Sequence, residues 1–97
     1  MLNSKQRAYL RGLANSIQPI YQVGKGGVSE TMLEQLSLTL EARKLIKITV
    51  LETCEFSARE VADGMESALN CDVISVVGRK VVLYRRSEKK QTIFLPT

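Results

Sequence analysis

Segments with the apolar spacing of helices alternate with strand-like segments along this 97-residue chain, and that alternation constrains the fold more than any other feature. Helical spacing begins at Ser4, which can act as a cap, and continues to about Ile17. It returns after Ser29 and again after Ser57, each placed to cap a helix. Strand patterns occupy residues 20–23, 45–51, 73–77 and 81–85. We therefore predict one compact α/β domain of order α-β-α-β-α-β-β with a mixed four-stranded sheet.

Local signals sharpen this prediction. Helices between strands imply parallel neighbours, and a turn at Gly78 that needs a positive φ adds an antiparallel hairpin. The basic tail, residues 87–97, either docks as an edge strand or stays loose. The buried stripe of the first helix is expected to comprise Tyr9, Leu10, Leu13, Ala14 and Ile17.

Three glycines in four residues, Gly24-Lys25-Gly26-Gly27, stand between the first predicted strand and the second helix. Glycine has no Cβ, so a sugar-phosphate chain can approach this backbone closely, and the helix N-terminus that follows favours phosphate. Lys25 adds a mobile positive charge at the tip. G-x-x-G in such a place is how KH domains clamp about four nucleotides. The loop therefore predicts an RNA-backbone site, and a tight turn without a ligand is the open alternative.

Two nucleotide-binding motifs do not fit the same glycines. A Walker loop would place Pro19 at its first glycine and Gly26 at its Ser or Thr. A dinucleotide fingerprint would have Ser29 at its third glycine, and its ribose-binding acid, Glu52, would follow Gly24 by 28 residues instead of ~20. We therefore expect no nucleotide cofactor and no small-molecule substrate.

Charge is segregated along the chain. Residues 1–47 sum to +4, residues 48–72 to −5 and residues 73–97 to +5. If the fold brings the two ends together, one face is positive and the other negative, which suits a polyanion such as nucleic acid. A solvated surface without a partner is the alternative.

Basic side chains outside the loop are candidates to widen an RNA site. Arg7 and Arg11 share one side of the first predicted helix, and Lys47 alternates with the core residues of a strand. Arg79-Lys80 at the hairpin and Arg85-Arg86 after it are further candidate phosphate contacts. Aromatic residues are too few for a stacking platform, so binding should follow the RNA backbone and depend strongly on salt.

Several classes of protein are disfavoured by what the chain lacks. It has no histidine, the commonest general base and zinc ligand, and its two cysteines cannot by themselves close a tetrahedral zinc site. We therefore expect neither an enzyme nor a metal site. No apolar run approaches the ~20 residues of a membrane helix, and the polar N-terminus lacks the core of a signal peptide. We expect a cytoplasmic protein with reduced thiols and no contact with membranes.

A set of short stretches, taken together, resembles the CRM domain family, and within it the YhbY-like bacterial single-domain proteins. The likeness covers nearly the whole chain as one domain over residues 1–97, and it departs at Val28, where the family usually has Leu. The matching stretches, in family order, are Lys5-Gln6, Leu10-Arg11-Gly12-Leu13-Ala14, Pro19, Gly24-Lys25-Gly26-Gly27-Val28-Ser29-Glu30, Leu45-Ile46-Lys47-Ile48, Val77-Gly78-Arg79, Val82-Leu83-Tyr84-Arg85 and Leu95-Pro96.

The resemblance implies a fold similar to the C-terminal domain of translation initiation factor three. It also implies RNA binding through the G-x-x-G loop and association with precursors of the large ribosomal subunit. The family glycines carry over to Gly24 and Gly27 and the basic tip to Lys25, whereas Gly26 occupies a position that varies in the family.

From the residues and the resemblance together, we expect a cytoplasmic factor that binds ribosomal RNA and acts in ribosome assembly. The rival hypothesis is a protein-interaction adaptor, which would dock on ribosomal proteins through the acidic segment and Ile93-Phe94-Leu95 with incidental RNA contact. The predicted RNA contacts are Gly24, Lys25, Gly26, Gly27, Arg7, Arg11 and Lys47.

Overall fold

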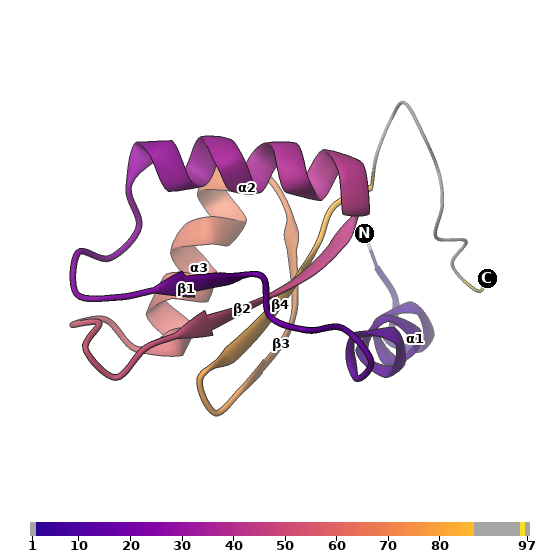
Figure 1. The fold of residues 1–97 in the computed structure, drawn as a ribbon. Coiled ribbons are helices and arrows are strands. Elements are labelled where there is room, and N and C mark those ends of the chain that lie inside the picture. Colours follow the sequence, from indigo (N-terminus) through magenta and orange to yellow (C-terminus); the bar gives the residue numbers. More distant parts are fainter. Residues whose placement is uncertain (1, 87–95, 97) are drawn as a thin grey trace.

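The computed structural model describes residues 2–86 and residue 96. Within them, three helices and four strands follow one another in the predicted order, and the predicted α/β class is confirmed (Figure 1). None of these helices is long and apolar enough to cross a membrane. The elements are α1 (Ser4–Ala14), β1 (Tyr21–Val23), α2 (Glu30–Arg43), β2 (Leu45–Val50), α3 (Ala58–Leu69), β3 (Asp72–Val77) and β4 (Lys80–Tyr84).

The four strands form one mixed sheet in the order β1-β2-β4-β3. β1 pairs with β2 in parallel, and β4 pairs with both β2 and β3 in antiparallel fashion. The expectation that helix-linked strands are parallel neighbours is right for β1 and β2 and wrong for β2 and β3. The reason is that β4 folds back from the turn at Gly78 and takes the place between β2 and β3.

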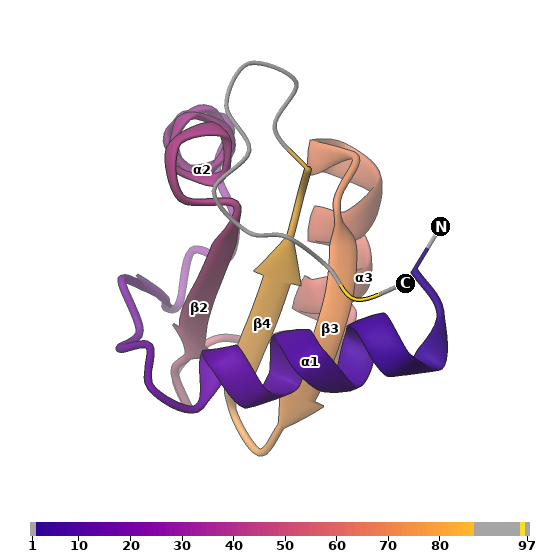
Figure 2. The same ribbon diagram turned by 90° about the vertical axis from the view of Figure 1, so that its right-hand side faces the viewer.

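Helices cover both faces of the sheet (Figure 2). On one face α2 and α3 share a core with the sheet, which includes Leu36, Met65 and Ile48. On the other face α1 crosses the strands, and a second core includes Leu10 and Val82. We call these the α2/α3 side and the α1 side. Each fully buried Leu or Ile in these cores contributes about 1.5–3 kcal/mol, so the two cores hold the layers together.

The start of α1 differs from the prediction in one residue. Asn3, not Ser4, is the cap: its Oδ1 accepts a hydrogen bond from the Gln6 amide at 2.8 Å, and Gln6 Oε1 accepts one from the Asn3 amide at 3.1 Å. This reciprocal box satisfies two amides, which a single cap at Ser4 would not.

The far end and the buried stripe of α1 also differ. The helix ends at Ala14 instead of near Ile17, although the Ile17 amide still donates to the Ala14 carbonyl at 3.1 Å. Tyr9 is 42% exposed because it lies at the edge of a stripe whose centre is the buried pair Leu10 and Ala14.

The caps of the other helices and the hairpin are confirmed. Ser29 Oγ accepts from the Met32 amide at 3.1 Å, and Ser57 caps α3 in a reciprocal capping box with Glu60. Gly78 turns the hairpin with φ +59°. The prediction for the tail lies outside the described residues, apart from Pro96.

Candidate nucleic-acid interface

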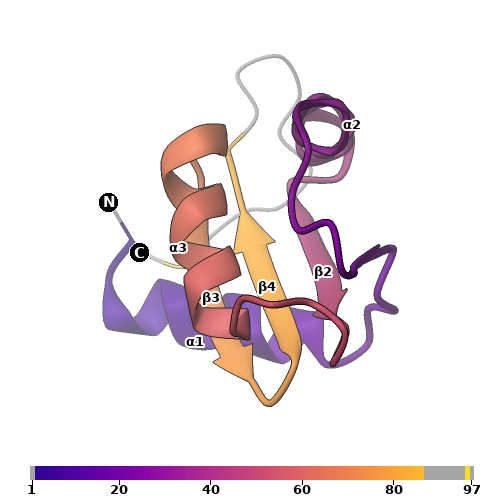
Figure 3. The ribbon, with the colours of Figure 1, turned by 90° about the vertical axis from the view of Figure 1, so that its left-hand side faces the viewer.

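The glycine loop lies at the end of the sheet where β1 and β2 finish, an end that also carries the β3–β4 turn (Figure 3). The Gly27 amide donates to the Gly24 carbonyl at 2.9 Å, which closes a tight turn. Gly27 has φ +70°, in the left-handed region that side chains with a Cβ rarely adopt. The positive φ therefore accounts for a glycine at position 27. The glycines at positions 24 and 26 do not have a positive φ, so their surroundings must be considered instead.

A second loop, residues 51–57, packs beside the glycine loop. The Leu51 amide donates to the Val23 carbonyl at 2.8 Å. A Cβ built on Gly24 would lie 3.6 Å from Leu51 Cδ1, and one built on Gly27 would lie 3.5 Å from the ring of Phe56. A Cβ on Gly26 would meet nothing within 4 Å. Gly24 and Gly27 thus face the protein, whereas Gly26 faces open space.

The tip of the glycine loop is exposed. Within the described part of the chain, the amides of Lys25 and Gly26 have no hydrogen-bond partner, and the Lys25 ammonium has no ion pair. Unpaired amides and an ammonium group together suit phosphate oxygens. The start of α2 contributes less, because Ser29 already accepts from one of its amides and Glu30 places a negative charge in its first turn.

The sheet divides the charge of the molecule. The first 29 residues contain no Asp or Glu, and the four strands contain one, Asp72 at the start of β3, opposite Tyr84 of the α1-side core. The other described acids gather on the α2/α3 side, on α2, the 51–57 loop and α3. They are Glu30, Glu34, Glu41, Glu52, Glu55, Glu60, Asp63 and Glu66. The glycine loop lies where the two sides meet.

Arg7 and Arg11 do not lie beside the glycine loop. Both belong to α1, which crosses the opposite end of the molecule (Figure 1). The guanidinium of Arg7 donates to the carbonyl of Val73 in β3, while Arg11 is exposed. These two arginines therefore lie on the α1 side, but apart from the loop that they were predicted to extend.

Lys47 lies closer to the loop, in the middle of β2. Its neighbours Ile46 and Ile48 are buried in the α2/α3 core, so its own side chain projects to the α1 side, where it is half-buried. Its carbonyl accepts a hydrogen bond from the Ile20 amide at 2.9 Å, just before β1. The predicted position of Lys47 on the face of the sheet opposite the strand's core residues agrees with the structure.

The β3–β4 turn brings two further cations to the loop end of the sheet. Arg79 Nη1 donates to the Leu51 carbonyl at 3.4 Å, and the Leu51 amide in turn donates to the carbonyl of Val23, the residue before the glycine loop. Lys80 Nζ donates to Thr49 Oγ1 at 3.1 Å. Arg79 and Lys80 are thus nearer to the glycine loop than Arg7 and Arg11, which sequence spacing alone does not indicate.

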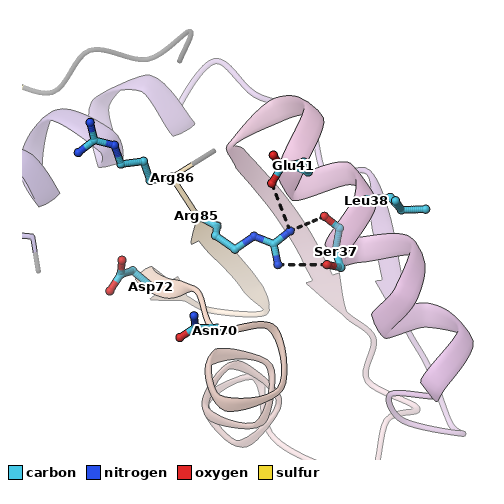
Figure 4. A pocket seen from close by; sticks show the side chains of 7 residues that line it. All are labelled: Ser37, Leu38, Glu41, Asn70, Asp72, Arg85 and Arg86. Atoms are coloured by element: carbon cyan, nitrogen blue, oxygen red, sulfur yellow. Dashed lines mark hydrogen bonds and ion pairs between the residues drawn. The ribbon is translucent and has the colours of Figure 1, made fainter. Parts of the chain in front are cut away.

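Arg85 is held by the protein itself (Figure 4). Beside a hollow of about 580 Å³, its guanidinium donates to Ser37 Oγ at 3.1 Å, to the Ser37 carbonyl at 2.6 Å and to the Leu69 carbonyl at 3.0 Å. Glu41 lies 4.0 Å away. These contacts join β4 to α2 and α3, so Arg85 has a structural role that does not require RNA.

Two side chains, Cys71 and Glu60, have a pKa shifted by their surroundings. Burial raises the pKa of the Cys71 thiol to about 11, and the nearby carboxylates of Asp72 and Glu66 add to this. The hydrogen bonds from Ser57 hold the pKa of Glu60 below its ordinary value. Cys71 and Cys54 are both free and buried. In the described residues, no three side chains of the His, Cys, Asp or Glu types gather as metal ligands.

Comparison with known proteins gives a consistent result. The model of the CRS1 / YhbY (CRM) domain matches residues 2–85. The "Probable RNA-binding protein YqeI" of Bacillus subtilis is 41% identical over 96 residues, which cover 99% of this chain and 100% of the relative. An "RNA-binding protein" of Haemophilus influenzae is 27% identical over 88 residues, covering 91% and 89%.

A solved structure extends the likeness to the fold. The solution structure of a protein from Staphylococcus aureus superposes with a TM-score of 0.82 at 43% sequence identity. The match covers 99% of this chain and 100% of that one.

Proposed function

The chain belongs to the CRS1 / YhbY (CRM) domain family, and from this premise we propose that it is an RNA-binding protein that grips the RNA backbone with its glycine loop. The names of its relatives support the RNA partner. The observation that supports the loop assignment is the exposed tip, where the amides of Lys25 and Gly26 have no hydrogen-bond partner among the described residues and the Lys25 side chain is exposed. We further propose that the chain is not an enzyme.

The RNA that we propose is ribosomal, in precursors of the large subunit, and the process is ribosome assembly in the cytoplasm. Support for this finer assignment comes from the resemblance of the whole chain to YhbY-like proteins. A backbone-directed site also suits a large folded RNA, because such a site reads shape and phosphate position instead of a base sequence.

Lys25→Glu tests the role of the loop. Lys25 is exposed and has no ion pair among the described residues, so the free energy of unfolding of the variant should lie within about 0.5 kcal/mol of that of the parent chain. Its affinity for large-subunit ribosomal RNA freed of protein should fall on the order of 10-fold at 0.1 M salt, since one phosphate contact is lost and a repulsion is added. Filter binding and urea unfolding measure the two quantities.

Arg43→Glu is the matched control, because it makes the same change of charge at an exposed site at the far end of α2. Unchanged affinity in the Lys25 variant would remove the loop from the mechanism. Failure of the parent chain to bind protein-free RNA, together with capture by ribosomal proteins, would favour the adaptor hypothesis.

A further inference from the structure

A hollow of about 200 Å³ opens on the α1 side of the sheet, where α1 ends. It combines two lysine side chains with an amide and a hydroxyl, and none of its walls is acidic. Its lining residues are Ala14, Asn15, Lys47, Ser75, Val77, Lys80 and Val82.

Two like charges sit close together in this hollow. Lys47 is opposite Val82 and Thr49 is opposite Lys80, so the two lysines are diagonal neighbours on adjacent strands. Diagonal side chains on one face lie about 7–8 Å apart, within reach of long side chains, and two like charges at that separation repel each other. Among the described residues, neither ammonium has a carboxylate partner. An anion between them would offset the repulsion, and Asn15 and Ser75 offer hydrogen-bond donors to it.

A row of paired residues connects the loop end of the sheet with the hollow. Gln22, Thr49 and Lys80 are paired across β1, β2 and β4 in one row. The loop begins two residues after Gln22, so this row lies between the loop and the hollow. On the other side of the hollow, Asn15, the C-cap of α1, lies four residues or about one helical turn after Arg11. A track of cations thus leads from the loop across the hollow to α1.

We propose that this hollow is a second phosphate-binding subsite, occupied by the RNA strand as it leaves the glycine loop. The inference rests on the proposed function and adds the path of the strand. The strand turns to the α1 side because the other way leads past the carboxylates of the 51–57 loop and α3. Lys47 and Lys80 neutralise the phosphate, while Asn15 and Ser75 donate hydrogen bonds to its oxygens.

The test removes both ammonium groups in Lys47→Gln/Lys80→Gln. Its matched control, Arg43→Gln/Arg59→Gln, removes two exposed cations from the α2/α3 side and so changes net charge equally. The probes are unpaired RNAs of increasing length, beginning at the four nucleotides or so that a G-x-x-G loop holds. Fluorescence anisotropy gives the affinity at several salt concentrations, and thermal unfolding shows that each variant is folded.

The parent chain should bind longer RNAs more tightly than the shortest one, and the hollow variant should lose that gain. With two phosphate contacts removed, the magnitude of the slope of log affinity against log salt should fall by about 1.4. This change corresponds to an affinity about 25-fold lower at 0.1 M salt. The shortest RNA should bind the hollow variant and the control alike. Lys80→Gln alone, at an exposed position, should show about half of the change in slope.

Equal affinity of the hollow variant and its control for every length would overturn the subsite and leave the loop assignment intact. An equal loss for short and long RNAs would also overturn it, since that result reports a general loss of charge. If the parent chain bound no RNA, the proposed function itself would fail. The three results are distinguishable in one experiment.

Discussion

Replacing Gly27 with alanine should destabilise the domain more than replacing Gly26, by about 1–2 kcal/mol. The reason is local: Gly27 has φ +70°, where an L-residue is strained, while the φ of Gly26 is not in that region. Space is not the cause, because a Cβ on Gly27 would meet Phe56 at 3.5 Å, an ordinary contact.

The comparison between the two variants isolates the strain. Each glycine-to-alanine change also restricts the unfolded chain, which stabilises the fold by about 0.4–1 kcal/mol. This gain is common to both and cancels in the difference. Gly26→Ala, with open space around its Cβ, should therefore be as stable as the parent or slightly more so. Gly27→Ala should be less stable than the parent by about 1 kcal/mol.

Thermal unfolding by circular dichroism measures the difference. For a domain of this size, 1 kcal/mol shifts Tm by about 4–8 °C, so the two variants should be separated by at least that much. Gly78→Ala, at φ +59° with open space around it, should lose stability like Gly27→Ala. If Gly27→Ala and Gly26→Ala unfolded at the same temperature, the assignment of positive φ to Gly27 would be refuted.

Two further predictions concern groups away from the glycine loop. Because burial raises the pKa of Cys71 from 9.0 to about 11, the folded state keeps a proton that the unfolded state loses. The contribution of the protonated Cys71 thiol to the free energy of unfolding is fully present below pH 9 and is lost as the pH rises to about 11, by up to about 2 kcal/mol. Urea unfolding of the parent chain and of Cys71→Ala across this pH range should show the difference. Arg85→Met should cost about 2–3 kcal/mol, because it leaves acceptors on Ser37 and Leu69 unpaired, and should leave RNA affinity unchanged. The exposed Arg86→Met is its control, and a large loss of RNA affinity in Arg85→Met would restore the phosphate role for that arginine.

Features set by neighbouring residues were predictable from the sequence. The box of Ser57 and Glu60, the cap at Ser29 and the turn at Gly78 each depend on residues within one turn of chain, so their pattern is visible in the sequence itself. The Asn3 cap is of the same kind and was missed because the neighbouring Ser4 is an equally good cap residue.

Features set by long-range packing were not predictable in the same way. Nothing near β3 indicates that β4 separates it from β2, since strand order depends on pairing across the whole domain. Lys44 is another case: it is buried at 1% exposure with φ +67°, although lysine is among the residues least often buried. Its amide donates to the Leu40 carbonyl in α2, and its carbonyl accepts a hydrogen bond from the amide of Arg85, which follows β4 and is distant in sequence. The placement of Arg7 apart from the loop has the same origin, because long-range packing determines which face of the sheet α1 covers.

The position of the loop at the boundary between two charged sides has a physical consequence for the direction of a bound strand. At physiological salt the reach of a surface charge is about 8 Å, so only charges close to the loop act on a phosphate there. Lys25 is the one cation within the loop itself, and a single phosphate contact cannot hold RNA at such salt. The acids nearest to the loop along the chain and in the packed 51–57 loop are Glu30, Glu52 and Glu55, and the further cations at the loop end of the sheet are Arg79 and Lys80 of the β3–β4 turn. A phosphate chain that begins at the tip would therefore be repelled by these acids and attracted by these cations, and the fold would give the strand a direction before any base is read.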